Sequence, residues 1–278
     1  DGCFEENETL KQVNLGNSVR EIGADAFKEC SNLQAVQFGN SVEKVGDNAF
    51  QNCLELKEIS ALENVKEIGE RAFAECKSLD FENMNTKLTS IGEGAFVRSG
   101  ITSFECNELS DGQLGLGAFC GCDKLKSVSL NAGVQVIKDS AFADCPLLVE
   151  INLGTEIKTI GAYAFEKCIA LKSVVIPEGT ISIGGAAFRN CFNLVEVSLP
   201  DTLESLGSWC FEACSALEKI SIPRKIHEMN YLFNGCSALK EIEIQGEGLE
   251  KIIGNSFYRC LELKKIVIPK SVKYISDS

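Results

Sequence analysis

The sequence predicts an α/β repeat solenoid, in which one short structural unit recurs along the whole chain of 278 residues. Three observations lead to this fold class. A phenylalanine returns every 23 residues, a cysteine follows it three residues later, and an alternating apolar segment comes next. A fixed period of this length is typical of solenoids, whose units pack only on their neighbours.

The phenylalanine series sets the number and order of the units. Its steps are 23 residues long except for the last two, of 22 and 24, and its members are Phe4, Phe27, Phe50, Phe73, Phe96, Phe119, Phe142, Phe165, Phe188, Phe211, Phe233 and Phe257. Because no linker interrupts the period, we expect residues 1–278 to form a single domain of about twelve coils. The chain starts and stops within a unit, so we expect truncation at both ends, with any signal peptide or anchor outside it.

Each unit contains a predicted strand. In the unit that ends at Phe188, inward-facing Val174 and Ile176 alternate with outward-facing Ser173 and Val175, which is the period of a β-strand. Each strand returns at the same register after one coil, so the strands should pair in parallel. The expected result is one parallel sheet along the concave side of the solenoid.

The remainder of each unit turns the chain. Its pattern, I-G-x-x-A-F-x-x-C-x-x-L, is too short for a full helix and predicts a turn with a short helical or 3₁₀ segment on the convex side. Phe should fill the wide part of each coil. The glycine four residues before it, such as Gly161 or Gly184, should supply either a positive φ or a close approach of two backbones.

These runs resemble the repeats of BspA-like leucine-rich repeat proteins, the short class found in bacterial surface proteins and in some parasitic protists. The resemblance covers essentially residues 1–278 and rests on the recurring pattern seen at Ile22, Gly23, Ala26, Phe27, Cys30 and Leu33. It implies a right-handed leucine-rich-repeat solenoid. It also implies adhesion, with which proteins of this type are associated.

Ten of the fourteen cysteines share one phase, three residues after the repeat phenylalanine: Cys30, Cys53, Cys76, Cys122, Cys145, Cys168, Cys191, Cys214, Cys236 and Cys260. One phase predicts one stacked column of buried thiols, each able to donate weakly to a turn carbonyl. Neighbours in such a column lie within disulfide reach, but their parallel Cβ vectors are poor geometry for bridging. We therefore expect a reduced ladder, which suits a cytosol or an anaerobic habitat.

The formal net charge of −13 argues against nucleic acid and against anionic membrane surfaces as partners. It is compatible with a basic protein partner, and equally with acidity that only keeps a long molecule soluble. The chain has no apolar run of about 18 or more residues, so we expect no membrane insertion.

Catalytic and metal-binding sets are poorly supported. The chain has one histidine, His227, which removes most catalytic triads and all two-histidine metal sites. A Cys–His dyad would need His227 near Cys210 or Cys214, and Cys214 belongs to the buried column. We expect no enzyme, no catalytic residue, no metal and no cofactor.

The outward strand positions form the candidate protein-binding face. They mix lysine, glutamate, serine and isolated valine, so ion pairs between neighbouring coils are expected, each worth little at the surface. The candidate contact residues on this face are Lys126, Ser129, Glu150, Asn152, Lys172, Val175, Glu196, Ser198, Lys219, Ser221, Glu241 and Glu243.

Two segments depart from the period, around residues 79–113 and 225–257. The first places Ser99 in the cysteine phase and Glu82 at an inward strand position; it predicts either a local register shift or a protruding loop that contacts a partner. In and beside the second lie the candidate edge contacts Trp209, His227 and Tyr231. Structural packing of the Trp209 ring remains the alternative to contact with a partner.

Two functional classes remain open. The first is a non-enzymatic binding module of a cell-surface or secreted protein, which adheres to host proteins of the extracellular matrix or plasma. The second is an intracellular or cell-wall-associated scaffold for the organism's own proteins. Open solenoid ends expose unpaired strands, so the predicted state is a monomer or a weak end-to-end dimer.

Overall fold

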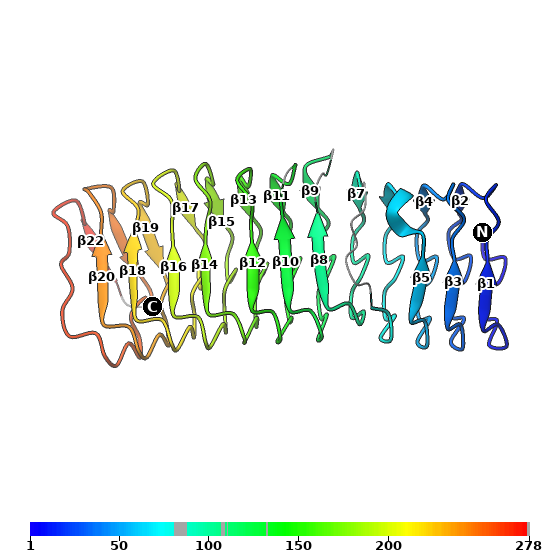
Figure 1. Cartoon of the computed structure of the whole chain (residues 1–278). Coiled ribbons are helices and arrows are strands. Elements are labelled where there is room, and N and C mark those ends of the chain that lie inside the picture. Colours follow the sequence, from blue (N-terminus) through cyan, green and yellow to red (C-terminus); the bar gives the residue numbers. More distant parts are fainter. Residues whose placement is uncertain (81–87, 107–108, 110, 132, 277–278) are drawn as a thin grey trace.

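The computed structural model describes residues 1–80, 88–106, 109, 111–131 and 133–276. It shows a row of stacked coils that runs from the N-terminus to the C-terminus (Figure 1). Each regular coil contains a longer strand, a short strand and a turn around the repeat phenylalanine. The expected parallel solenoid is confirmed.

The longer strands pair in parallel, one coil with the next. Val174 faces Val197 across neighbouring coils, a step of 23 residues. These strands form three sheets, ordered β1-β3-β5, β12-β10-β8 and β14-β16-β18-β20. Their bounds are β1 Gln12–Asn14, β3 Ala35–Gln37, β5 Glu58–Ser60, β8 Ser103–Cys106, β10 Ser127–Leu130, β12 Glu150–Asn152, β14 Ser173–Val175, β16 Glu196–Ser198, β18 Lys219–Ile222 and β20 Glu241–Ile244.

A second parallel ladder, which the sequence did not predict, is formed by the short strands just before the repeat glycine. Nine of them make one sheet and the last three another. Most have only two residues, too few for an alternating pattern to be seen in the sequence. The strands are β2 Glu21–Ile22, β4 Lys44–Val45, β6 Glu67–Ile68, β7 Ser90–Ile91, β9 Gln113–Leu114, β11 Val136–Ile137, β13 Thr159–Ile160, β15 Ser182–Ile183, β17 Ser205–Leu206, β19 Glu228–Asn230, β21 Lys251–Ile253 and β22 Tyr274–Ile275.

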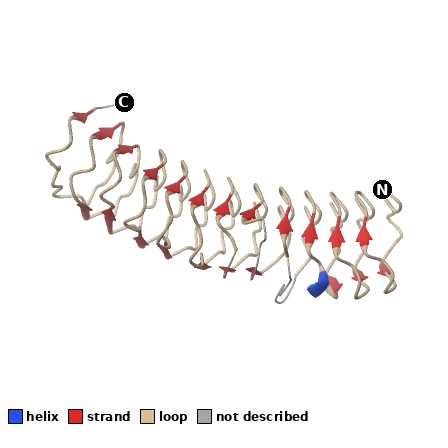
Figure 2. Cartoon of the chain, turned by 90° about the horizontal axis from the view of Figure 1, so that it is seen from above, coloured by secondary structure: helices blue, strands red, loops and turns tan. Residues whose placement is uncertain are grey.

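The stack of coils bends, and its concave side is not the one that the sequence predicted. Figure 2 shows the short strands on the inner side of the bend and the longer strands on the outer side. The expectation of a concave sheet of longer strands is therefore wrong. The ladders agree with this geometry, because among the described residues the inner one runs through nine strands while the outer one, which a bend stretches, is interrupted between β12 and β14.

The segments around the repeat phenylalanines are turns, and the expected helical segments are not found there. Among the described residues, the one helix is a 3₁₀ turn, η1 Leu62–Asn64, which follows β5. At every repeat phenylalanine except Phe257, the residues two before and two after it adopt positive φ, as at Ser140 (56°) and Asp144 (58°). A left-handed residue interrupts a right-handed helix. The N–H of Phe142 instead donates to the carbonyl of Ala164 in the next coil, at 2.8 Å.

A column of phenylalanine rings runs through the core, packed among buried leucine, isoleucine, valine and cysteine side chains. Successive rings from Phe4 to Phe257 stack in eleven pairs, with centroids 5.2–6.1 Å apart. The repeat glycines allow this spacing through close approach and not through positive φ. A Cβ placed on Gly46 would lie 2.8 Å from the backbone nitrogen of Ala24. Real Cβ atoms essentially never come that close, so a side chain at Gly46 would push the two backbones apart.

The first departure from the period leaves the core continuous. The Ser99 side chain is buried, and its Oγ lies 3.6 Å from the Cys122 Sγ, so serine takes a cysteine's place in the column. Strand β8 pairs with β10 in parallel, and Phe104 faces Val128 there. Glu82 lies outside the described residues.

Candidate protein-binding surface

All twelve candidate contact residues of the sequence lie on one surface. Each is exposed or half-buried, and each belongs to, or directly precedes, one of the strands β10, β12, β14, β16, β18 and β20. We call the outward side of the longer strands the long-strand face. The inward residues behind it, such as Val174 and Ile220, are buried in the core, which holds this face in a fixed position.

Charged side chains on the C-terminal part of this face pair between neighbouring coils, as expected. The Lys219 Nζ lies 3.2 Å from the Glu241 Oε2, and the Lys240 Nζ lies 3.0 Å from the Glu218 Oε1. Both pairs are exposed to solvent, where water screens the charges, so they add little to stability. Because these charged groups are already paired with each other, they are not immediately available to a partner.

The central part of the face is hollowed, because serine occupies many of its outward positions. The hollow has a volume of 490 Å³ and spans β8, β10 and β12 to reach the first residue of β14. We call it the serine hollow. The side chains that line it include Ser103, Glu105, Ser127, Ser129, Glu150 and Ser173.

A chain of side-chain hydrogen bonds crosses one wall of the serine hollow. The Asn152 Nδ2 donates to the Ser129 Oγ at 3.2 Å, and the Ser129 Oγ donates to the Asn131 Oδ1 at 2.9 Å. The Asn131 Nδ2 in turn donates to the Glu105 Oε1 at 2.9 Å. Several polar groups are thus held in place before any ligand arrives.

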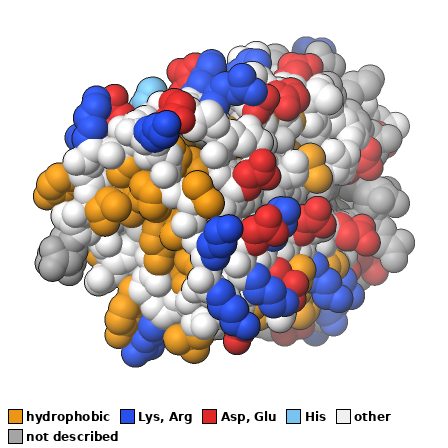
Figure 3. Space-filling model, turned by 90° about the vertical axis from the view of Figure 1, so that its left-hand side faces the viewer, with side chains coloured by type: hydrophobic (Ala, Val, Ile, Leu, Met, Phe, Trp, Pro, Cys, Tyr) orange, Lys and Arg blue, Asp and Glu red, His pale blue; other side chains and the backbone are white. Residues whose placement is uncertain are grey.

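A second hollow, of 570 Å³, lies at the C-terminal end of the same face. It separates β20 from the last copy of the strand motif, around Lys265 and Val267, which adopts no strand. The end of the molecule beyond it carries exposed apolar side chains, including Leu261, Val267 and Ile275, and Figure 3 shows hydrophobic groups gathered there. End-to-end association through this surface stays a prediction.

The candidate edge residues Trp209 and Tyr231 are brought together, although they come from different coils. Their rings stack with centroids 5.1 Å apart, and the Trp209 side chain keeps 41% of its surface exposed. Each stands two residues before a repeat phenylalanine, so a common phase in the sequence would have found the pair. The same phase holds Tyr163, whose ring is covered by Arg189 at 5.3 Å, a contact that the sequence reasoning missed.

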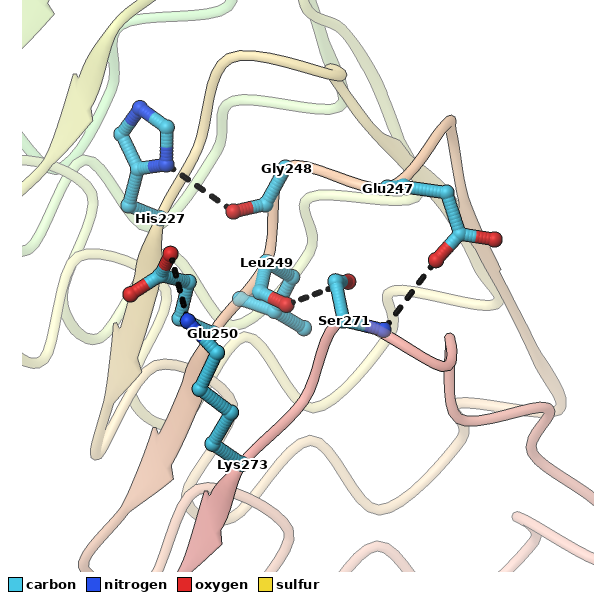
Figure 4. Close-up of polar contacts among 7 residues, drawn as sticks. All are labelled: His227, Glu247, Gly248, Leu249, Glu250, Ser271 and Lys273. Atoms are coloured by element: carbon cyan, nitrogen blue, oxygen red, sulfur yellow. Dashed lines mark hydrogen bonds and ion pairs between the residues drawn. The ribbon is translucent and has the colours of Figure 1, made fainter.

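His227 is not part of the stacked Trp209–Tyr231 pair; instead it forms a hydrogen bond to a turn around Gly248. Its Nδ1 lies 2.9 Å from the Gly248 carbonyl oxygen, as Figure 4 shows, and so donates a hydrogen bond to it. Close by, the Ser271 Oγ donates to the Leu249 carbonyl at 2.6 Å. These contacts fix a turn of the second irregular segment and give His227 a structural partner within the chain.

The geometry contradicts a Cys–His dyad. The Cys210 and Cys214 side chains are fully buried, and the Cys214 thiol donates to the Phe188 carbonyl at 3.2 Å. His227 is exposed and already bonded to Gly248. Burial raises the pKa of Cys214 well above its ordinary value, so a reactive thiolate is disfavoured at neutral pH.

The cysteine column is present, and its predicted hydrogen bond is confirmed. Each column thiol donates to the phenylalanine carbonyl of an adjacent coil, as Cys145 does to Phe119 at 3.2 Å. All ten column cysteines are free thiols. Burial raises the pKa of Cys122 and of Cys191 to about 12, which keeps both thiols protonated as donors.

Two features of the described part of the chain bear on other functions. Within it, no group of three or more histidine, cysteine, aspartate or glutamate side chains is arranged to hold a metal ion. No described helix is long and apolar enough to cross a membrane.

Comparison with known proteins identifies the repeat. The family profile described as "BspA type Leucine rich repeat region (6 copies)" matches residues 1–112, 108–179 and 158–278. None of the curated proteins matches the chain.

Solved structures give the same answer for the fold. A leucine-rich cell surface protein from Faecalibacterium prausnitzii A2-165 is 26% identical, with 97% of this chain and 79% of that chain covered and a TM-score of 0.53. The T. pallidum leucine-rich repeat protein is 28% identical over 62% of this chain and 81% of that chain, with a TM-score of 0.56. A leucine-rich repeat protein from Eubacterium ventriosum ATCC 27560 shares 20% identity and the fold, at a TM-score of 0.60 over 96% of this chain and 81% of that chain. The chain therefore belongs to the BspA-type leucine-rich repeat family.

Proposed function

We propose that this chain is a non-enzymatic, protein-binding module of a cell-surface or secreted protein, and that it adheres to host proteins of the extracellular matrix or plasma. The observation that carries the proposal is the long-strand face itself. Ten strands present their alternate side chains to solvent on one side, while the residues between them are anchored in a buried core. A rigid and extended surface of this kind suits recognition of a large partner.

The character of the face favours a protein ligand. Its outward residues mix both charges with hydroxyl and amide groups, and Val175 adds an apolar contact with 69% of its surface exposed. Protein interfaces combine polar and apolar contacts in this way. The surface location is supported by family membership and by the F. prausnitzii relative, which is described as a cell surface protein.

A binding screen tests the proposal. The purified, reduced protein is passed over an array of extracellular-matrix and plasma proteins at physiological salt, and we expect saturable binding to at least one of them. Reversal of charge at Lys172 and Glu196, both on the long-strand face, should weaken that binding, because rim charges steer association.

The matched control reverses Lys158, which is exposed beside β13 on the short-strand side. This variant should bind as the unmodified protein does. Absence of any saturable partner, with the protein folded and monomeric, would count against adhesion and favour the scaffold for the organism's own proteins.

A further inference from the structure

The outer sheet is interrupted in the middle of the molecule, between β12 and β14. One sheet ends at β12 and the next begins at β14, although the neighbouring pairs on both sides are joined by hydrogen bonds. The coils themselves remain in contact at this point. The Phe142 and Phe165 rings stack at 5.4 Å, and the short strands β13 and β15 stay paired.

The interruption leaves backbone polar groups available at the edge of the serine hollow. In the next coil, the N–H groups of Val195 and Glu196 both donate to the Lys172 carbonyl. By the same pattern, the Val149 carbonyl would accept from the N–H groups of Lys172 and Ser173, but neither bond is present. Val149 lines the hollow, so its carbonyl lacks this repeat partner at the edge of the hollow. A polar backbone group without a partner favours any ligand that satisfies it.

The carboxylates of the hollow also lack cationic partners. Thirteen ion pairs join described residues, and neither Glu105 nor Glu150 takes part in any of them. No lysine or arginine lines the hollow among the described residues. Lys126 and Lys172 lie in flanking positions one residue before their strands, outside the lining.

The geometry points to the serine hollow as a subsite for an arginine side chain of the protein partner. This inference deepens the proposed function and rests on it for the nature of the partner. The lining offers carboxylate, hydroxyl and amide oxygens, and the Val149 backbone carbonyl, all of which can accept hydrogen bonds. A guanidinium group brings five donors and no acceptor.

Arginine fits this lining better than lysine does. The acceptors lie on several sides of the hollow, from β8 to the start of β14, and a planar fork of donors reaches more of them than a single ammonium group. Val149 also lines the hollow, with 44% of its surface exposed, and offers an apolar wall to the aliphatic stem of the side chain.

A direct titration tests the subsite without knowledge of the partner. The ¹⁵N-labelled protein is titrated with N-acetyl-arginine amide while amide chemical shifts are followed. We expect saturable shifts at the amides of Ser127, Glu150 and Ser173, weaker binding of N-acetyl-lysine amide, and no binding of N-acetyl-citrulline amide, which is uncharged. Glu150→Gln should weaken the arginine probe by about tenfold, the effect of losing one charge-assisted hydrogen bond.

The control variant is Glu196→Gln. Glu196 faces Ser173 from the next coil and is exposed at the same strand position as Glu150, but it does not line the hollow. It should leave the titration unchanged. The inference is overturned if the citrulline probe binds equally, if Glu196→Gln weakens binding as much as Glu150→Gln, or if the shifts spread evenly over all exposed carboxylates.

The titration also separates this inference from the adhesion proposal. If the array yields no partner while the arginine probe saturates at the hollow, the subsite stands and the adhesive role fails. If a partner binds the long-strand face but the probe gives no shift at the hollow, the subsite fails and the adhesive role stands.

Discussion

At the scale of single residues, the cysteine column combines packing with hydrogen bonding. A thiol is small enough to stack in every coil, and its proton donates a hydrogen bond to the phenylalanine carbonyl of the preceding coil. Cys168, for example, donates to the Phe142 carbonyl at 3.3 Å. Ser99 takes the cysteine position in its coil, and its hydroxyl contacts the next thiol of the column, that of Cys122, at 3.6 Å.

Burial should make the column thiols unreactive. Alkylation of the folded protein with iodoacetamide at pH 8 is expected to modify the exposed Cys3 first and the half-buried Cys120 later, and to spare Cys145. Peptide mass spectrometry measures the extent at each site, with the protein in denaturant as the control in which every thiol reacts. Equal labelling of Cys145 and Cys3 in the folded state would contradict the buried column.

Alkaline pH should destabilise the fold through the same thiols. Burial raises the pKa of Cys191 from 9.0 to about 12. Between these values the unfolded chain has lost the proton and the folded chain keeps it, so the free energy of unfolding falls as pH rises. Near pH 10, denaturant unfolding of the protein should show a steeper fall than that of Cys191→Ala, by about 1.4 kcal/mol per pH unit. Equal slopes for both would exclude this thiol as a source.

The residues in left-handed conformation on either side of the phenylalanines carry local strain. Lys167 has a φ of 58°, a conformation that glycine adopts more readily. We expect Lys167→Gly to raise the free energy of unfolding by about 1 kcal/mol. The control is Lys172→Gly, at an exposed lysine with ordinary φ, which should lower it by about 0.5–1 kcal/mol. Denaturant unfolding of both variants compares them, and a loss in both would refute the strain at Lys167.

At the scale of elements, the short-strand ladder depends on the repeat glycines. The Gly161 N–H donates to the Ile137 carbonyl of the preceding coil at 2.7 Å. Lys138 occupies the glycine position in another coil, and its N–H lies 3.2 Å from the Leu114 carbonyl. Where a residue with a Cβ stands in the glycine position, the hydrogen bond between the coils is therefore longer, 3.2 Å at Lys138 against 2.7 Å at Gly161.

Two adjacent glycines provide a matched test of this close approach. A Cβ on Gly184 would lie 2.6 Å from the carbonyl carbon of Gly161, whereas one on Gly185 would lie 3.3 Å from the Ser208 oxygen. Gly184→Ala should cost about 1–3 kcal/mol in unfolding free energy, and Gly185→Ala less than about 1 kcal/mol. Ala162 already occupies the Gly185 position one coil earlier. Equal costs in thermal unfolding would refute the steric argument.

At the scale of the whole molecule, the phenylalanine column links all coils, and each ring contacts mainly its neighbours. Phe142 stacks between Phe119 at 5.3 Å and Phe165 at 5.4 Å and is fully buried. Stability in such an array is close to a sum of contributions from each coil and from each contact between neighbouring coils. Damage in the middle should therefore weaken the connection between two halves.

Phe142→Ala should lower the free energy of unfolding by about 3–5 kcal/mol and broaden the transition, because the cavity interrupts the column. Circular dichroism during chemical denaturation measures both effects. Phe4→Ala is the control, since Phe4 stacks on one neighbour only and keeps 45% of its surface exposed. A sharp, unshifted transition in Phe142→Ala would contradict the stacked core.

The sequence alone determined the features that repeat. The period of 23 residues places Phe188 and Cys191 in columns, and alternation separates inward Val174 from outward Val175. These predictions hold because identical positions in stacked coils meet identical neighbours, so one unit describes the next. The candidate contact residues follow from the same alternation, which assigns each to the solvent side.

The tertiary structure alone decided how the coils add up. The direction of the bend, the ladder of two-residue strands, the break between β12 and β14 and the stacking of Trp209 on Tyr231 all depend on small differences in spacing between coils. A repeat pattern is nearly the same in every unit and so does not carry these differences. They depend on contacts between neighbouring coils, such as the stacking of Trp209 on Tyr231, which exist only once the coils are assembled.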